Sequence, residues 1–216
     1  MFMKLRKFPA GEIFHVFNRS IAKFGIFRNF DNSLRFYQAL DYYNNQNIKN
    51  NLGKFLLKNK NYYPQLLISE EEILIKFLAY CIMPDHYHLL VKVLTNNCLS
   101  KYVNDIENSY TRFFNTKLKR KGPLWESNFK VVRVTTNEQL LHLTRYIHLN
   151  PTTANLVNKP EDWSFSSYKN YITDEMILKK IITELSINSM TDYKKFVENQ
   201  KDYQRELKYI KRLILE

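Results

Sequence analysis

Apolar and polar residues follow two different spacings along the chain, and these spacings predict a series of strands and helices. Apolar residues are dense or alternate in four stretches that we expect to be strands: 12–20, 73–83, 86–93 and 129–134. They recur every three to five positions in three stretches that we expect to be helices: 33–43, 99–118 and 137–149. Pro84 and Asp85 predict a tight turn between two strands, and Pro151 is expected to stop the last of these helices. Helix N-caps are expected at Asp31 or Asn32, at Ser100, and at Thr135 or Thr136.

The predicted order is strand, helix, strand, strand, helix, strand, helix. It is typical of a ferredoxin-like βαββαβ sandwich, an α+β fold with helices on one face of an antiparallel sheet. We expect the seventh element to be an added catalytic helix. Residues 1–171 are assigned to one domain, with an Asn- and Lys-rich insertion at about 44–72 that holds a short helix near 52–57. Residues 163–171 are expected to pack as a cover, and 172–216 to form an extension with helices at 174–186 and 192–215.

Two histidines in the third strand are the first candidate for chemistry. Residues i and i+2 of a strand point to the same face, with Cβ atoms roughly 7 Å apart. His86 and His88 can therefore converge on one metal ion, while Tyr87 points into the core on the other face. Two histidines at this spacing are often only structural, and a metal site needs at least a third ligand.

The last of the core helices offers that ligand in the segment HLTRYIHLNP, residues 142–151. Tyr146 and Asn150 are four residues apart and share a helical face. The amide oxygen of Asn150 could complete a metal site, Tyr146 would then stand beside the ion, and His142 lies one turn further back. This mixed nitrogen and oxygen set suits Mg²⁺ or Mn²⁺, whereas zinc more usually takes a stronger third ligand.

The other histidines and the cysteines predict no further site. His148 lies off that helical face and is expected to be structural or exposed, and His15 is expected to be structural. Cys81 and Cys98 form no disulfide framework, which favours a reducing, cytoplasmic compartment. No apolar run approaches the ~20 residues that span a bilayer, and no secretory signal is recognisable, so no membrane partner is expected.

A positive charge indicates a polyanionic partner. Lys and Arg number 33 against 21 acidic residues, a net charge of +12, which favours nucleic acid, although a Lys- and Asn-rich composition can drift basic without a function. A dense basic run beside a tryptophan is typical of surfaces that follow a single strand, yet cations at a helix end are also favourable by themselves. The candidate contacts to DNA are Arg19, Lys117, Lys119, Arg120, Lys121, Trp125, Lys130 and Arg133.

The ordered motifs resemble one known family. PDHYHLLV is similar to the His-hydrophobe-His motif of HUH-type tyrosine transposases, and RYIHLNP is similar to their tyrosine helix, most of all in the REP-associated branch. HVFNRS, GPLWESNF and WSFSSYKNY add to a resemblance that covers residues 8–171. The chain departs from the family at Asp85, where Asn is usual, at Asn155, where a small residue such as Gly is usual, and in its long insertion. Asn155 can still serve the same turn, because Asn tolerates positive φ.

The resemblance implies a metal-dependent transposase and nickase of single-stranded DNA. His86, His88 and Asn150 would hold Mg²⁺ or Mn²⁺, and Tyr146 would attack phosphorus to form a 5′-phosphotyrosine that a 3′ hydroxyl later reverses. It also implies hairpin-forming single-stranded DNA as partner and a cytoplasmic, nucleoid-associated location, with monomer and homodimer both open. Two alternatives remain: a non-catalytic nucleic-acid-binding protein derived from a transposase, and a small metallohydrolase that uses His86 and His88 with water.

Overall fold

Four strands form one antiparallel sheet in the computed structural model, which describes residues 7–48, 50–67, 73–177 and 189–200. The strands are β1 (Ile13–Arg19), β2 (Ile75–Ile82), β3 (His86–Val93) and β4 (Lys130–Val134), in the order β2-β3-β1-β4. Every neighbouring pair is antiparallel, so β1, the first strand in the chain, lies inside the sheet between β3 and β4. The predicted ferredoxin-like α+β sandwich is confirmed.

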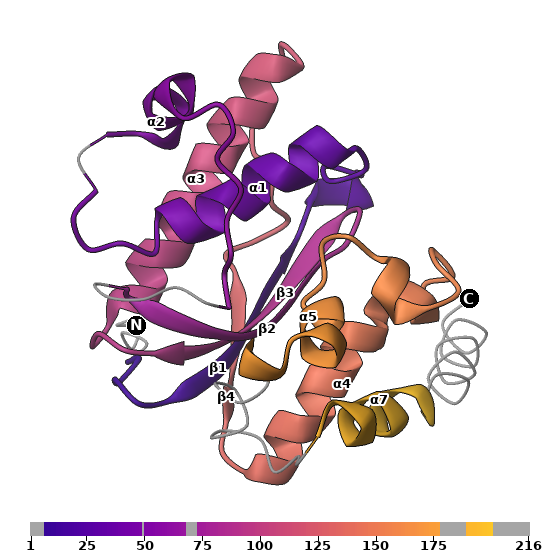
Figure 1. Cartoon of the computed structure of the whole chain (residues 1–216). Coiled ribbons are helices and arrows are strands. Elements are labelled where there is room, and N and C mark those ends of the chain that lie inside the picture. Colours follow the sequence, from indigo (N-terminus) through magenta and orange to yellow (C-terminus); the bar gives the residue numbers. More distant parts are fainter. Residues whose placement is uncertain (1–6, 49, 68–72, 178–188, 201–216) are drawn as a thin grey trace.

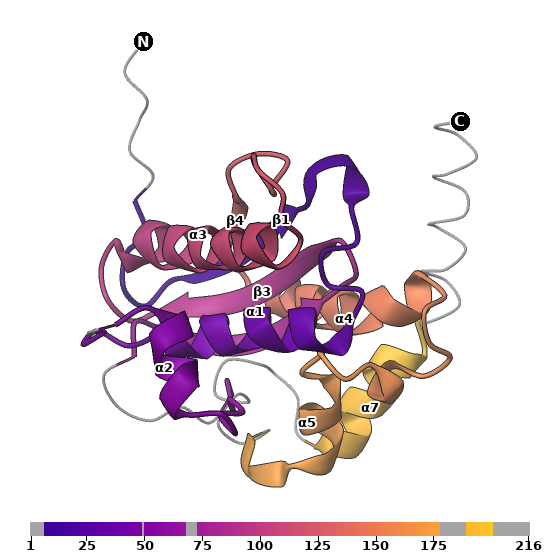
Figure 2. The same cartoon turned by 90° about the horizontal axis from the view of Figure 1, so that it is seen from above.

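Helices cover both faces of this sheet (Figures 1 and 2). On one face lie α1 (Phe30–Tyr42) and α3 (Cys98–Lys117), with the short α2 (Leu52–Lys58) of the insertion beside them. On the other face lie α4 (Asn137–Thr153), α5 (Tyr168–Thr173) and α7 (Met190–Glu198). Two short 3₁₀ turns, η1 (Ile21–Lys23) and η2 (Pro160–Asp162), join the elements. In the described part of the chain, no helix is both long and apolar enough to cross a membrane.

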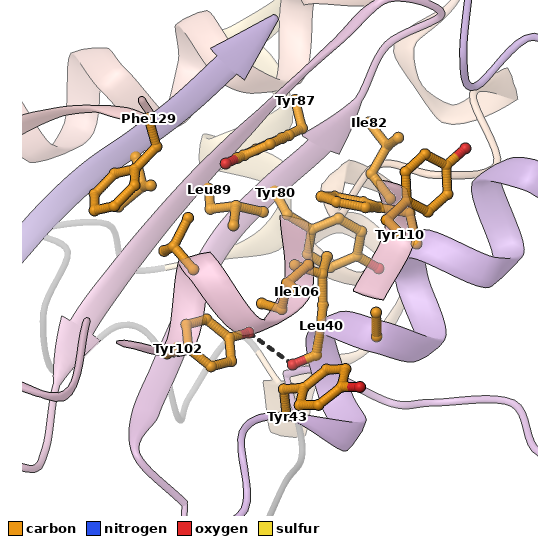
Figure 3. Close-up of a cluster of buried hydrophobic side chains, with 14 of the residues drawn as sticks. Leu40, Tyr43, Tyr80, Ile82, Tyr87, Leu89, Tyr102, Ile106, Tyr110 and Phe129 are labelled. Atoms are coloured by element: carbon orange, nitrogen blue, oxygen red, sulfur yellow. Dashed lines mark hydrogen bonds between the residues drawn. The ribbon is translucent and has the colours of Figure 1, made fainter. Parts of the chain in front are cut away.

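The larger of the two cores is aromatic and lies between the sheet and α1 and α3 (Figure 3). Tyr87, predicted to point away from the histidines, is buried here with 1% of its surface exposed. The Tyr102 hydroxyl in α3 donates to the Leu40 carbonyl of α1 over 2.6 Å, which ties the two helices together. Buried tyrosine hydroxyls need such partners, because an unpaired polar group in a core costs about 1–3 kcal/mol.

The second core lies between the sheet and α4, α5 and α7. Leu90 of β3 and Ile147 of α4 are fully buried in it, together with Tyr171 and Tyr193 of the last two helices. His148 of α4 is also fully buried, with Tyr193 Oη 2.5 Å from its Nδ1 and Ser167 Oγ 2.7 Å from its Nε2. His148 is therefore structural, as predicted. α7, which falls in the predicted extension, packs into the same layer as α4.

The segment after α4, residues 163–171, packs against the sheet as predicted. Trp163 donates its indole N–H to the carbonyl of Ile82 over 2.9 Å, and Ser166 bridges to Cys81 at the edge of β2. The predicted cover over residues 163–171 is therefore confirmed. The two helices predicted for 174–186 and 192–215 fall partly outside the described residues, and α7 accounts for the start of the second.

Two helix starts differ from the prediction, and one agrees with it. α1 begins one turn early because Asn29, rather than Asp31 or Asn32, accepts the capping hydrogen bond from Asn32 N. α3 begins at Cys98 after Asn97, which is left-handed (φ 58°) and makes no side-chain cap, so Ser100 is not the cap. The predicted cap of α4 at Thr136 is confirmed by its bond from Gln139 N.

Pro151 does not stop α4, which continues to Thr153. A proline lacks the N–H that would bond four residues back, but in a last turn this costs only one bond. The turn is still closed, because Ala154 N donates to Asn150 O over 2.9 Å. Asn155 then takes a positive φ of 55°, as expected for the residue that ends this helix.

Candidate active site

The sheet register places both candidate histidines on the face that α4 covers. His86 and His88 stand at the start of β3, opposite Arg19 and Phe17 of β1, and their ring centroids are 5.1 Å apart. They share a face because side chains two residues apart on a strand point in the same direction, as their spacing predicted. The two imidazoles are therefore neighbours at one end of the sheet.

His88 is enclosed by aromatic rings. Its Nδ1 lies 3.0 Å from Nε2 of His15 in β1, and the two rings are stacked with centroids 5.1 Å apart. Phe17 stacks on His15 and also contacts His88. Burial is the main cause that holds the pKa of His88 well below 6.5, with the charges of His86, His15 and Arg19 adding to it. His88 is therefore a neutral imidazole, the form that can donate a lone pair to a metal.

His86 is held by an acid. Its Nδ1 donates to Asp85 Oδ1 over 2.6 Å, and the second oxygen of Asp85 lies 3.6 Å from Nε of Arg19. Burial acts to raise the pKa of Asp85, but the hydrogen bond from His86 and the charges of His86 and Arg19 outweigh it, so this pKa is lowered. The Asp85 carboxylate thus holds the His86 ring through its Nδ1 atom.

The Nδ1 atoms of both rings are engaged in the described part of the chain, which leaves Nε2 of each for a further partner. Nε2 of His88 carries a lone pair when Nδ1–H donates to His15. Such bonds to the second nitrogen orient metal-binding histidines and fix their tautomer. The two Nε2 atoms are therefore the nitrogens through which His86 and His88 could bind a metal ion.

Tyr146 of α4 lies against this pair. Its ring meets that of His88 edge to face, with centroids 5.5 Å apart, and 42% of its surface is exposed. Asn150, one turn later, donates its Nδ2 to the carbonyl of Tyr146 over 3.0 Å, which leaves its amide oxygen as the group for a further partner. α4 therefore brings a reachable phenol to the histidines and presents an amide oxygen one turn away from it.

The donor set fits a metal of the Mg²⁺ or Mn²⁺ class only if Asn150 takes part. No group of three or more His, Cys, Asp or Glu side chains is placed to hold an ion among the residues that the structure describes. Two imidazoles with free Nε2 atoms and one amide oxygen form a mixed set of the kind these ions accept. The role of His86, His88 and Asn150 as ligands remains a prediction.

His142 contacts other groups. Its Nδ1 lies 2.7 Å from a guanidinium nitrogen of Arg145, and its ring faces Phe196 of α7. Glu138 lies 3.8 Å from its Nε2. These contacts turn His142 toward α7, so an accessory role beside Tyr146 stays a prediction.

The basic run lies at the end of α3. Lys119 and Lys121 are exposed, whereas Arg120 donates to Asn115 Oδ1 and to the Pro123 carbonyl, each over 2.9 Å. Lys117 donates to Asn32 Oδ1 over 2.7 Å. Arg120 thus shapes the loop, and the lysines are the side chains of this run that DNA could reach.

Trp125 makes the contacts of a packing residue. Its indole N–H donates to Thr111 Oγ1 over 3.1 Å, and its ring lies among Phe27, Phe36 and Tyr87 in the aromatic core. The side chain is half-buried. Stacking of a DNA base on Trp125 remains a prediction.

The two basic residues of the edge strand β4 differ. Lys130 pairs with Phe17 in the register, so it stands on the same face as His88 and borders the site. Arg133 pairs with Glu12 as an ion pair of 2.5 Å at the other end of the strand. Of these two, Lys130 is the better placed for a strand held at Tyr146.

His15 is the site residue that the sequence did not reveal, since it was expected to be only structural. The alternation of β1 puts His15 and Phe17 on one face, away from Phe14 and Val16 in the aromatic core. This alternation indicates that His15 points to the face of the sheet opposite the aromatic core. It does not predict that His15 contacts His88, because the two residues are 73 positions apart in the chain.

Comparisons with known proteins agree with these observations. Residues 59–150 match the model of a protein family described as "Transposase IS200 like". A Haemophilus influenzae protein described as a REP-associated tyrosine transposase is 24% identical over 109 residues, 46% of this chain and 62% of that relative. The chain thus spans less than two thirds of the relative's length, 62%.

A solved structure, described as a REP-associated tyrosine transposase bound to a REP hairpin, has the same fold. It matches at a TM-score of 0.52 and 17% identity, over 81% of this chain and 87% of its own. Over residues 59–150 the chain is thus similar to IS200-like transposases, and in sequence and in fold it is similar to REP-associated tyrosine transposases.

Proposed function

We propose that this chain is a transposase that nicks single-stranded DNA and rejoins it through a covalent intermediate on Tyr146, with the help of a divalent metal. The contact between the exposed Tyr146 ring and His88, 5.5 Å between centroids, carries the proposal. Most of the 15 tyrosines are buried packing residues, whereas Tyr146 is exposed and its ring contacts the imidazole of His88.

The ligands would be Nε2 of His86, Nε2 of His88 and Oδ1 of Asn150. An ion held there would supply Lewis-acid stabilisation of the charge that grows on the phosphate oxygens during attack. His15 and Asp85 would keep the two imidazoles in the tautomer and orientation that this requires.

Tyr146 Oη would attack phosphorus, forming a P–O bond while the bond from phosphorus to the 3′ oxygen breaks. The 5′ phosphate stays on Tyr146, and the 3′ hydroxyl leaves with a proton. The Tyr146 proton must pass to a base or to water at its exposed position. Attack by a 3′ hydroxyl on the phosphotyrosine reverses the step and restores the phenol. Each step exchanges one phosphodiester bond for another, so no nucleotide cofactor is required.

Hairpin-forming single-stranded DNA is the proposed substrate. The net charge of +12 favours a polyanion, and Lys130 borders the site on the face of His88. The structural relative was solved with a REP hairpin, which supports a hairpin as the ligand of this chain too.

The test is an adduct assay with 5′- and 3′-labelled hairpin DNA and Mn²⁺ or Mg²⁺. Wild type should form a protein–DNA adduct that carries the 5′ phosphate, and Tyr146→Phe should form none. Tyr63→Phe, which alters an exposed tyrosine (57%) of the insertion, is the matched control and should behave as wild type. Cleavage that survives Tyr146→Phe would support a metallohydrolase instead, and binding without any cleavage would support a non-catalytic nucleic-acid-binding protein.

A further inference from the structure

A cavity of about 590 Å³ is lined by residues of α1, α2 and α3. These helices lie on the face of the sheet opposite α4 (Figure 1). Three of its lining side chains are cationic, and none is an acid. The lining residues are Arg35, Asn51, Gly53, Ser109, Arg112, Phe113, Thr116 and Lys117. The cavity is thus a concentration of positive charge that the proposed reaction does not use.

Two of the cations share the ring of Phe113. The guanidinium carbon of Arg35 stands 5.1 Å from the ring centroid, and Nζ of Lys117 stands 5.7 Å from it. Such contacts attract a cation to the negative face of the ring. The ring therefore gathers cations that would otherwise repel one another.

The charge of the two arginines is not neutralised by the protein within residues 7–48, 50–67, 73–177 and 189–200. Neither Arg35 nor Arg112 forms an ion pair there. Arg35 is half-buried, and burial lowers its pKa. A half-buried guanidinium without a counter-charge is well suited to an external anion, and its planar fork of donors matches a phosphate.

The cavity is connected to the active-site end of the sheet by short links. Lys117 at its rim bonds to Asn32 of α1, and Asn32 Nδ2 donates to the Ile26 carbonyl over 3.1 Å. The next residue, Phe27, donates its N–H to the Pro84 carbonyl over 2.9 Å, two residues before His86. The exposed Lys119 and Lys121 follow directly after Lys117. These bonds tie the rim of the cavity to the turn before β3, and exposed basic side chains continue from that rim past the end of α3.

We propose that this cavity binds a backbone phosphate of the same nucleic acid that occupies the active-site end, through Arg35 and Arg112. The inference rests on the proposed function for the identity of the nucleic acid as single-stranded hairpin DNA. Phosphate contacts of this kind position a strand and make its affinity depend on salt without reading sequence.

The test compares Arg35→Gln/Arg112→Gln with Lys58→Gln/Lys60→Gln. The second pair removes the same charge from exposed lysines near α2 that do not line the cavity. Hairpin DNA affinity is measured across a salt series. We expect the arginine pair to bind several-fold more weakly than the lysine pair, with a slope of log K against log salt smaller by about 0.7 per phosphate lost. Arg35→Lys/Arg112→Lys keeps the charge and should keep the slope.

Equal affinities and slopes for the two Gln pairs, with both folded by circular dichroism, would overturn the inference. Calorimetry with inorganic phosphate tests the other source of the same chemistry. Phosphate binding that is lost in the arginine pair, together with unchanged DNA binding, would assign the cavity to a free anion and overturn the DNA contact. Because binding is measured without cleavage, a changed slope would support the cavity even if the Tyr146 adduct never forms.

Discussion

Nε2 of His15 lies 3.0 Å from Nδ1 of His88. The two residues are 73 positions apart in the chain and meet because β1 lies beside β3. This contact decides which nitrogen of His88 faces a further ligand. We therefore expect His15 to act as a positioning residue for the candidate metal site.

Replacement of His15 should weaken metal binding. His15→Phe keeps an aromatic ring but removes the partner of His88, and loss of such a partner typically lowers metal affinity 10–100-fold. His15→Gln keeps an acceptor and should lose less. Mn²⁺ affinity is measured by EPR titration, with thermal melting as a check of the fold. Equal Mn²⁺ affinity in both variants and wild type would show that His15 only packs.

Changes at Asn150 should affect metal affinity in opposite directions. Asn150→Ala removes the proposed third ligand, so Mn²⁺ should bind more weakly. Asn150→Asp keeps an oxygen and adds a negative charge, which a hard cation favours, so Mn²⁺ should bind more tightly. The measurement is calorimetric titration of the two variants and wild type. Identical affinities would exclude Asn150 as a ligand.

Glu107 should make stability depend on pH. It accepts hydrogen bonds from Asn18 and Tyr87, and burial raises its pKa from 4.5 to about 7 despite these bonds. A carboxyl whose folded pKa is raised stabilises the fold fully below about pH 4.5, and this stability is lost as the pH rises through about 7.

The isosteric Glu107→Gln carries no charge and can accept the same two bonds. Its unfolding free energy should rise relative to wild type as the pH increases from 4.5 to about 7, by on the order of 2–3 kcal/mol. Urea denaturation at several pH values measures the difference. A difference that does not change with pH would contradict the raised pKa.

Within the basic run, the lysines and the arginine should behave differently. Lys119→Gln/Lys121→Gln changes exposed side chains, so hairpin binding should weaken and its log–log salt slope should flatten by about 0.7 for each lost contact, without a loss of stability. Arg120→Gln breaks bonds to Asn115 and Pro123, so its melting temperature should fall as well. Filter binding across a salt series and thermal melting separate the two. An unchanged salt slope in Lys119→Gln/Lys121→Gln would show that the basic run is only a solvated helix end.

Local spacing was sufficient for much of the site. The strand period placed His86 and His88 on one face, and the helical period joined Tyr146 to Asn150. Helix ends were less predictable, because several neighbouring polar residues can cap and one lost bond at Pro151 is tolerated in a last turn. Trp125 shows a related limit, since an aromatic beside a basic run can pack as readily as it can stack.

By itself, the sequence determined the order of the strands and helices, the facing of the two histidines and the one-turn relation of Tyr146 and Asn150, because each depends on residues close in the chain. The tertiary structure decided that β1 lies beside β3, that α4 crosses the face of the histidines, and that Arg35 and Arg112 line one cavity. These depend on strand pairing and helix packing, which join segments far apart in sequence, and the periodicity of one segment does not specify which other segment will cover it.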